Sequence, residues 1–369
     1  MNREWNYRIA VAGILLLLCG MGQEGKKAWG EGEGVAASAT GPFVVPYFAV
    51  PEGLEFCGEP VPVHQPDVRE RLDREFTLVV YSHAQVYLWL KRMERYFPWL
   101  EKELLRNGLP DDLKYVAVAE SDLILSAASP AGAVGPWQFI RATGARFDLT
   151  QTNLVDERMD FETSTVSAFR YLRSLHQMFS NWTLAVAAYN CGEKRVQDEM
   201  RKQRVDNYYA LKLPLETERY ILRIVSIKEV LGNPGRYGYS LPKTAAYPAI
   251  RVDRVNVRLS GSTPVVDLAE AAGITYREFK NLNPVLISDV VPEGTMTLKV
   301  PEGKGTEFLR RIEGITRRQG SPVLDHRVSK GETLSGIAAR YGVSEQCLME
   351  ANGMKDKTVR TGQVLKISK

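Results

Sequence analysis

The chain has 369 residues, of which 44% are hydrophobic and 25% charged, a composition typical of a globular protein with two or three domains. Its 48 Lys and Arg residues against 44 Asp and Glu give a net charge of +4, which suits an anionic polymer as partner without requiring one. Because the basic residues are spread along the chain rather than clustered, we expect no nucleic-acid partner.

The N-terminus has the pattern of an export signal. Two arginines precede the run "IAVAGILLLLCG", which is too short for a comfortable membrane span. We predict a signal peptide over residues 1–22, cleaved after Gly22 or near Gly30; a retained N-terminal anchor, and so a membrane association, is the alternative. Cys19 lies where a lipoprotein cysteine could be, but a large leucine precedes it, so lipidation stays open.

The other cysteines and the histidines predict neither disulfides nor a metal site. Without Cys19, three cysteines remain (Cys57, Cys191 and Cys347), and an odd number is not a disulfide framework. Their spacing resembles no metal site, and the four histidines are scattered. We therefore expect no metal and no other cofactor.

Composition changes along the chain. Residues 23–74 are rich in Gly, Ala and Pro, as in a tether. Apolar residues then recur at helical spacing, for example Ala168, Leu172 and Leu175. Residues 75–240 are thus predicted to form a mainly helical domain.

The C-terminal third contains an internal repeat. "LAEAAGITYREFKNLN" from Leu268 aligns without gaps to "IAARYGVSEQCLMEAN" from Ile337, and an apolar strand follows each copy. This predicts two small strand–helix–helix–strand (βααβ) units over residues 250–302 and 325–369, joined by a linker over 303–324.

The second copy resembles a LysM domain along its full length, through "GETL" from Gly331, "YGV" from Tyr341 and "NG" from Asn352. LysM domains are α+β modules that bind N-acetylglucosamine-containing glycans. The resemblance implies a groove between the loops that carry Gly331, Glu332, Thr333, Leu334 and Asn352. The alternative is that these residues only cap helices. The first copy has "SGSTPVV" in place of that loop, so we expect it to be a divergent LysM-like unit acting as a spacer.

One carboxylate interrupts an apolar helical face. In "DDLKYVAVAE", Leu113, Val116, Ala117 and Glu120 are spaced i, i+3, i+4 and i+7, so the face that packs into the core ends in Glu120. Burial there would raise its pKa above about 4.3 and favour a general acid. The alternative is a structural glutamate at a helix end.

A loop of Ser, Pro and Gly follows Glu120 and is expected to be flexible and open to a bulky substrate. Pro136 is predicted to begin a helix, which would leave Trp137 and Gln138 on an exposed first turn. Asp122 should point away from Glu120, because it lies only two residues further along the helix.

The motifs around this loop resemble those of the lytic transglycosylases of the lysozyme-like superfamily. They are Glu120-Ser121, "SPAGA" with "GPWQ" from Ser129 to Gln138, "AAYNCG" from Ala187, and "LPLETERYI" from Leu213, in that order. The resemblance implies a lysozyme-like, mainly α catalytic domain followed by LysM-type units. Two residues depart from the family pattern: Pro136 where it has Leu, and Cys191 where it has Ala.

The resemblance implies roles for seven residues. Glu120 is expected to be the catalytic acid and then the base. Ser129 and Gln138 would hydrogen-bond sugar substituents, and Tyr189, Asn190 and Tyr220 would line the site. Glu216 lies one helical turn before Tyr220, so both can face one site. The alternatives are a helix C-cap for Asn190, core tyrosines, and a Glu216 that only orients other side chains; Trp137 is expected to pack rather than to stack on sugar.

The expected activity is that of a peptidoglycan lytic transglycosylase, a carbon–oxygen lyase of the bacterial periplasm or cell envelope. It would cleave the β-1,4 bond between MurNAc and GlcNAc with formation of 1,6-anhydro-MurNAc. A hydrolytic muramidase is an alternative, and it would need a second carboxylate such as Asp148, Asp156 or Glu162. A glycan-binding morphogenetic protein with weak or no activity is the other.

Overall fold

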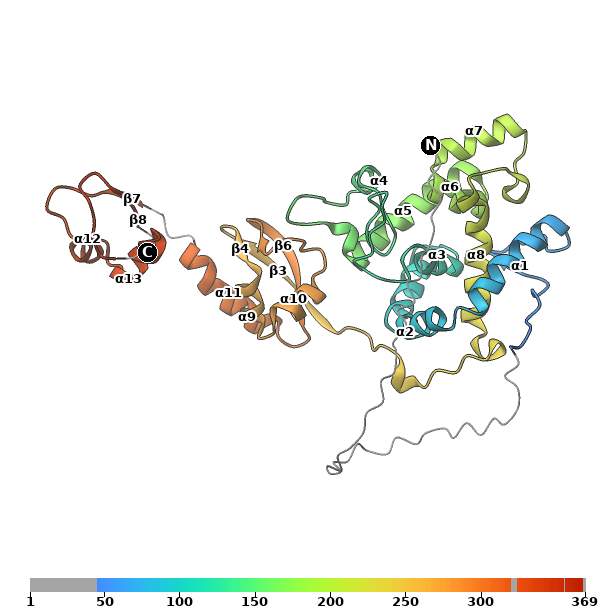
Figure 1. Cartoon of the computed structure of the whole chain (residues 1–369), viewed down its shortest axis with the longest axis horizontal. Coiled ribbons are helices and arrows are strands. Elements are labelled where there is room, and N and C mark those ends of the chain that lie inside the picture. The colour runs from blue at the N-terminus through green and yellow to red at the C-terminus, as the bar shows by residue number, and fades with distance from the viewer. Residues whose placement is uncertain (1–44, 320–323, 355, 368–369) are drawn as a thin grey trace, which may run out of the picture. The chain divides into compact units, whose positions relative to one another are not determined.

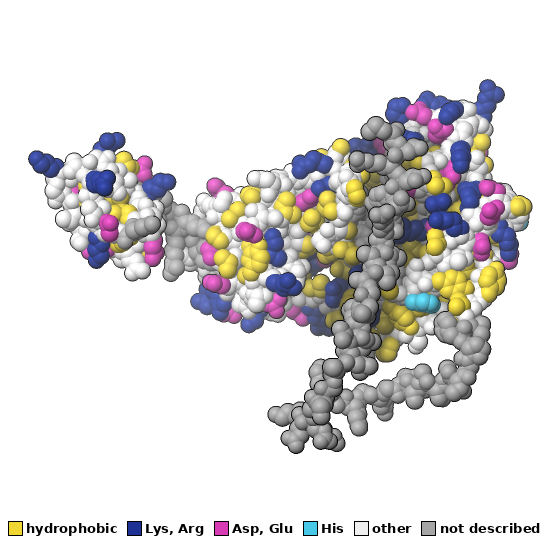
Figure 2. Space-filling view, in the orientation of Figure 1, with side chains coloured by type: hydrophobic (Ala, Val, Ile, Leu, Met, Phe, Trp, Pro, Cys, Tyr) yellow, Lys and Arg dark blue, Asp and Glu magenta, His cyan; other side chains and the backbone are white. Residues whose placement is uncertain are grey.

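The computed structural model describes residues 45–319, 324–354 and 356–367. The predicted signal or anchor over residues 1–22, with Cys19, lies outside the described residues. Of the helices within them, none is both long enough and apolar enough to cross a membrane. On the face seen in Figure 2, Lys and Arg side chains are interspersed with Asp and Glu.

The first part of the described chain is mainly helical, as predicted (Figure 1). Helix α8 is central to it, because it is buried along most of its length and contacts α1, α3 and α6. Two short strands, β1 (Glu55–Phe56) and β2 (Glu59–Pro60), precede the helices. The helices are α1 (Pro66–Val80), α2 (His83–Arg106), α3 (Lys114–Ser121), α4 (Arg141–Arg146), α5 (Phe161–Phe179), α6 (Trp182–Cys191), α7 (Glu193–Gln203) and α8 (Leu215–Gly232), with 3-10 turns at Asp111–Leu113, Glu157–Met159, Tyr208–Ala210, Pro234–Tyr237 and Lys243–Ala245.

Part of the segment expected to be a tether packs in the helical core instead. Phe56 and Val61 are buried in the same core as Phe76 of α1, and α1 begins at Pro66. The high Pro and Gly content predicted a tether, but widely spaced apolar residues lie among the prolines and glycines. Their burial stabilises the irregular segment in the helical core. Of the expected tether over residues 23–74, the stretch from Val50 onward therefore belongs to the helical domain.

The loop after Glu120 is a hydrogen-bonded hairpin and not an open loop. Its main-chain bonds run from Ser129 N to Ala133 O (2.8 Å), from Val134 N to Phe139 O (3.1 Å) and from Gly135 N to Ala127 O (2.8 Å). We call residues 127–139 the active-site loop.

The prediction that Pro136 begins a helix is wrong. Residues 135–138 form a turn, and the next helix, α4, begins only at Arg141. Gln138 has a φ of 48°, in the left-handed region, which ends any helical continuation from Pro136.

The middle unit has the predicted order of a strand, two helices and a strand. Strand β3 (Val252–Leu259) pairs antiparallel with β6 (Gly294–Pro301), so that Val252 lies opposite Pro301 and Leu259 opposite Gly294. Between them lie β4 (Thr263–Pro264), α9 (Val265–Ala272), α10 (Tyr276–Leu282) and β5 (Val290–Val291), and β4 pairs with β5.

The predicted linker over 303–324 is largely a helix of this middle unit. Helix α11 (Gly305–Gln319) contacts α9 and β3, and its Phe308 and Ile312 are buried in the core of the unit. These two residues are four positions apart, so they lie on one face of the helix. The i, i+4 spacing of these two apolar residues indicates a helix, but the composition of the segment led us to predict a linker.

The C-terminal unit has the same element order: β7 (Leu324–Arg327), α12 (Leu334–Tyr341), α13 (Glu345–Ala351) and β8 (Val364–Ile367), with β7 and β8 antiparallel. The repeat extends to single hydrogen bonds. Asn352 donates to Leu348 O and accepts from Lys366 N (2.7 Å). Its counterpart Asn283 donates to Phe279 O and accepts from Lys299 N (2.7 Å). In each unit one asparagine thus joins the second helix to the last strand.

Candidate active site

Glu120 is the penultimate residue of α3, and its surroundings follow the predicted pattern. Leu113, Val116 and Ala117 are fully buried, whereas Glu120 at the end of the same face is partly exposed. The helix ends because Asp122 adopts a left-handed conformation with a φ of 56°. The Asp122 carboxylate accepts a hydrogen bond from Trp89 Nε1 (2.8 Å), so it points away from Glu120 as expected.

Tyr220 of α8 supplies the hydrogen bond to Glu120, donating from its hydroxyl to Oε1. Burial raises the pKa of Glu120 to about 7, although the Tyr220 hydrogen bond and the charge of Arg223 act in the opposite direction. The charge of Glu216 adds to the increase. Near neutral pH both protonation states are therefore accessible, as a group that first gives and then takes a proton requires.

The two predicted tyrosines have different partners. Tyr220 is buried, and its hydroxyl bonds to Glu120, whereas the Tyr189 hydroxyl donates to Trp137 O (2.7 Å) in the active-site loop. Burial and the Glu120 charge keep the pKa of both tyrosines well above 10, so both hydroxyls stay protonated donors. Tyr189 also packs against the ring of Tyr171, with 5.2 Å between ring centroids.

Asn190 is not the C-cap of α6, since Gly192 occupies that position with a φ of 92°. The Asn190 side chain instead accepts a hydrogen bond from Thr217 Oγ1 (2.6 Å), which links α6 to α8. Glu216 is exposed on the first turn of α8, one turn before Tyr220 as predicted.

The loop residues hold the loop itself together. Ser129 Oγ accepts from Ala133 N (3.1 Å), and Gln138 Nε2 donates to Gly135 O (2.9 Å). The predicted exposure of Trp137 is wrong: its side chain is fully buried and donates to Thr165 Oγ1 (2.8 Å). The expectation that Trp137 packs rather than stacks on sugar agrees with this burial.

The three carboxylates considered as a second catalytic group each form ion pairs. Asp148 pairs with Arg170 (2.8 Å) on the surface, and Asp156 pairs with Arg158 (2.6 Å) in the interior. Glu162 pairs with Arg254 of the middle unit. These contacts give each carboxylate a structural partner.

The residues expected to bind glycan in the C-terminal unit have structural contacts. Thr333 caps α12 by accepting from Gly336 N (3.2 Å), and Leu334 is buried. Glu332 accepts from Ser329 N (2.7 Å) and contacts His326 (2.9 Å). Gly331 has a φ of 90°, which favours glycine. The helix-capping alternative thus applies to Thr333 at least.

Sequence reasoning missed two contributors to the site. Arg223 lies three residues after Tyr220 on α8 and lowers the pKa of Glu120, and the 216–220–223 spacing would have placed it on that face. Ser121 is buried, and its Oγ donates to Pro136 O (2.9 Å), which joins the residue after Glu120 to the active-site loop. No local sequence signal reveals that long-range bond.

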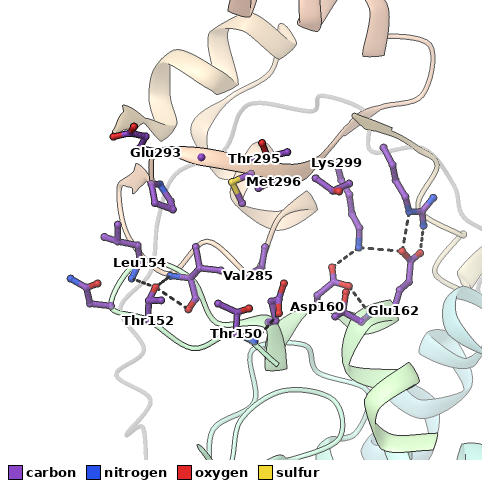
Figure 3. A pocket seen from close by; sticks show the side chains of 18 residues that line it. Thr150, Thr152, Leu154, Asp160, Glu162, Val285, Glu293, Thr295, Met296 and Lys299 are labelled. Carbon is purple, nitrogen blue, oxygen red and sulfur yellow. Dashed lines mark hydrogen bonds and ion pairs between the residues drawn. The ribbon is translucent and has the colours of Figure 1, made fainter. Parts of the chain in front are cut away.

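A pocket of about 680 Å³ lies away from these residues. It is formed by residues 150–163 and by the β5–β6 region of the middle unit. Figure 3 shows Thr150, Thr152 and Asp160 on one side and Thr295, Met296 and Lys299 on the other. Its lining includes Glu162, one of the three candidate second carboxylates, but not Glu120 or the residues predicted to bind substrate around it.

Two domain families match this chain: residues 97–211 match the transglycosylase SLT domain, and residues 326–368 match the LysM domain. The chain thus contains a segment similar to the transglycosylase SLT domain and, after it, a segment similar to the LysM domain. The first copy of the repeat lies outside both matches, so the LysM domain is recognised for the second copy, and the divergent LysM-like character of the first stays a prediction.

The relatives include membrane-bound lytic murein transglycosylase D of Escherichia coli (strain K12), 31% identical over 292 residues, which are 75% of this chain and 64% of the relative. The protein of the same name from Escherichia coli O6:H1 has the same values. The chain thus spans 64% of the length of these two relatives.

Two further matches cover less. N-acetylmuramoyl-L-alanine amidase sle1 of Staphylococcus saprophyticus is 46% identical over 43 residues, 12% of this chain and 13% of that protein. The X-ray structure of an inactive mutant of lytic transglycosylase Slt from Pseudomonas aeruginosa aligns with a TM-score of 0.30 and 21% identity over 41% of this chain and 26% of that one. That structural similarity is too low to establish a shared fold.

Proposed function

We propose that this protein is a peptidoglycan lytic transglycosylase that cleaves the β-1,4 bond between MurNAc and GlcNAc and forms 1,6-anhydro-MurNAc. The observation that carries the proposal is the state of Glu120. Inside a transglycosylase SLT domain, its carboxyl is hydrogen-bonded by Tyr220 and has a pKa of about 7. A carboxyl with such a pKa can act as an acid and then as a base at neutral pH.

In the first step, protonated Glu120 gives its proton to the glycosidic oxygen, and the bond to C1 of MurNAc breaks. The acetamido group of the substrate stabilises the cationic centre. The Tyr220 hydrogen bond stabilises the carboxylate that forms on Glu120.

In the second step, the Glu120 carboxylate takes the proton of the C6 hydroxyl of the same MurNAc, and O6 bonds to C1. No water is consumed. Because the nucleophile belongs to the substrate, proximity replaces the second protein carboxylate that most glycosidases use. Asp148, Asp156 and Glu162 are then free for the ion pairs that they form.

We assign substrate contacts to the side chains around Glu120. The amide nitrogen of Gln138 already donates hydrogen bonds within the active-site loop, so its amide oxygen is the atom that accepts a hydrogen bond from a sugar N–H or hydroxyl. Ser129, Asn190 and Glu216 contribute polar groups, and Tyr189 contributes the face of its ring.

The LysM domain serves as the glycan tether of this enzyme, through Gly331, Glu332, Thr333, Leu334 and Asn352. The middle unit, a divergent LysM-like unit, is a spacer without a glycan site of its own. We expect the enzyme to act at the bacterial cell envelope, either in the periplasm or anchored by the N-terminus. The export-signal pattern of residues 1–22 and the similarity to proteins named as membrane-bound support this expectation.

The test compares Glu120→Gln with Asp148→Asn on purified sacculi. Glu120→Gln keeps the shape of the side chain but cannot give and retake a proton, so release of soluble muropeptides should fall by at least about 100-fold. Asp148→Asn changes an exposed carboxylate of the same domain and should leave release near the wild-type rate. Near-normal release by Glu120→Gln would refute the assignment of the catalytic residue.

A further inference from the structure

Arg158 is a buried arginine that ties the active-site loop to the segment before α5. Its Nη1 donates to Gly132 O (3.1 Å) and to Phe139 O (2.9 Å), at the tip and at the end of the loop. Its Nε and Nη2 donate to the two oxygens of Asp156 (2.9 and 2.6 Å). The side chains of Arg158 and Asp156 are only 6% and 9% exposed, so the bidentate pair is fixed in the interior.

The backbone of Arg158 also touches the loop. Gly135 has a φ of 88°, and a Cβ at this position would lie 1.8 Å from the carbonyl oxygen of Arg158. Only glycine permits that approach. The loop is therefore held against Arg158 both by the guanidinium and by close backbone packing.

The same loop reaches the surroundings of Glu120. Pro136 O accepts from Ser121 Oγ (2.9 Å), next to Glu120 in the chain, and Trp137 O accepts from Tyr189 Oη (2.7 Å). A shift of the loop would release both hydrogen bonds and change how water reaches the carboxyl of Glu120.

The middle unit contacts the segment that carries Asp156 and Arg158. Asp156 N donates to Val285 O (2.9 Å), and Ile287 N donates to Leu154 O (3.0 Å). Val155 forms an antiparallel bridge with Leu286 and is buried in the apolar core of the middle unit. One residue of the catalytic part is thus a core residue of the neighbouring unit.

Ion pairs reinforce this contact on the wall of the pocket in Figure 3. Lys299 of β6 donates to Asp160 Oδ2 (2.6 Å), while the other oxygen of Asp160 caps α5 by accepting from Thr163 N (2.9 Å). Burial alone would raise the pKa of Asp160, but the charge and hydrogen bond of Lys299 and the bond from Thr163 lower it. Arg254 of β3 pairs with Glu162 in the same way.

We propose that Asp156 and Arg158 are a positioning pair for the reaction at Glu120, and that the middle unit holds this pair in place as a fixed support of the active site. The proposal rests on the proposed function, since it concerns the same reaction. It gives the middle unit a role in turnover that does not need a glycan site. The contact chain runs from β6 and the 285–287 segment through Asp156 and Arg158 to the loop beside Glu120.

The first test uses Arg158→Lys, with Arg170→Lys as the matched control. The single ammonium nitrogen of lysine cannot reproduce the bonds that Arg158 makes from Nε, Nη1 and Nη2. Arg170, by contrast, forms one exposed ion pair from α5. On soluble glycan strands, Arg158→Lys should lower kcat by about 10-fold or more while KM changes less, and Arg170→Lys should change neither. Near-UV circular dichroism and the unfolding midpoint verify that both variants are folded.

The pH profile separates positioning from a simple loss of folded enzyme. The groups facing Glu120 are Tyr189 of α6 and Glu216, Tyr220 and Arg223 of α8. If the loop moves, water lowers the pKa of Glu120 from about 7 towards its ordinary value, so the activity of Arg158→Lys should begin to fall at lower pH than that of the wild type. A smaller folded fraction would lower the rate without moving this midpoint.

The second test changes a residue of the middle unit, so it tests the proposal even if Arg158→Lys does not fold. Lys299→Ala removes the tie to Asp160, and Arg251→Ala, an exposed residue that pairs only loosely with Glu302 (3.7 Å), is its control. We expect about a 3- to 10-fold lower kcat and the same direction of pH shift for Lys299→Ala alone. Wild-type kcat and pH profile in folded Arg158→Lys, or in Lys299→Ala, would overturn the proposal. An inactive wild type would instead contradict the proposed function.

Discussion

The Tyr220 hydroxyl donates a hydrogen bond to the Glu120 carboxylate, so the last turn of α3 is joined to α8 across 100 residues of sequence. This contact sets the chemistry of the site in two ways. It favours the carboxylate form and so opposes the effect of burial on the pKa of Glu120. It also presents a donor to the charge that develops when Glu120 gives up its proton.

Tyr220→Phe should therefore move the pH profile upward. Without the hydrogen bond that lowers it, the pKa of Glu120 rises above about 7, and the loss of activity on the alkaline side begins at higher pH. The rate at the optimum should fall by about 10-fold, because the carboxylate formed in the first step loses a donor. The measurement is kcat/KM against pH on soluble glycan strands. A downward shift of the alkaline limb would contradict this account of the pair.

Glu120 should also make stability depend on pH. Its pKa in the folded protein, about 7, is above its ordinary value of 4.5, so the folded state binds more protons between these two pH values. Stability is then lost as pH rises through this window, and the loss is complete above pH 7. Glu120→Gln lacks this penalty and should be more stable than the wild type at pH 8 by about 1–3 kcal/mol, a range reduced for the partial exposure of the side chain.

Urea denaturation followed by tryptophan fluorescence measures this difference, because Trp89, Trp99, Trp137 and Trp182 all lie in the helical part. The difference in unfolding free energy between Glu120→Gln and the wild type is compared at pH 5 and pH 8. The contributions of the other titrating groups cancel in this difference, because both proteins contain them. A constant difference between Glu120→Gln and the wild type at both pH values would mean that the pKa of Glu120 is not raised.

Removal of the LysM domain should weaken binding without altering the chemistry. A linked binding module raises the local concentration of substrate, so deletion of residues 325–369 should reduce pull-down on sacculi. Turnover of short soluble glycans should stay close to that of the full chain, because the deletion leaves Glu120 and its partners intact. Equal pull-down with and without residues 325–369 would remove the binding role.

Cys191 should be structural. It is the last residue of α6, where the lytic transglycosylase pattern has Ala, and burial raises the pKa of its thiol, which disfavours the reactive thiolate. Cys191→Ala should keep more than half of the wild-type activity, and a thiol-blocking reagent should inhibit the wild type little. Complete loss of activity in Cys191→Ala would show that the thiol has a chemical role.

Local pattern was enough to predict some features and not others. The spacing of Leu113, Val116 and Ala117 placed Glu120 at the end of a buried face, and the repeat placed Asn283 and Asn352 in equivalent positions. Both signals act within one element or one small unit.

The missed features depend on contacts between distant residues. The turn at Pro136 follows from the left-handed Gln138 and from Gly135 packed on Arg158, and composition carries no trace of either. The burial of Phe56 in what looks like a tether likewise depends on a core assembled from the other helices.

The mass of the muropeptides that the wild-type enzyme releases from purified sacculi tests the central claim most directly. If Glu120 takes the proton of the C6 hydroxyl, each product ends in 1,6-anhydro-MurNAc, is one water lighter than the hydrolytic product and has no reducing end. Glu120→Gln should release almost none of it. Muropeptides with reducing ends as the main product would contradict the account and make the enzyme a hydrolase.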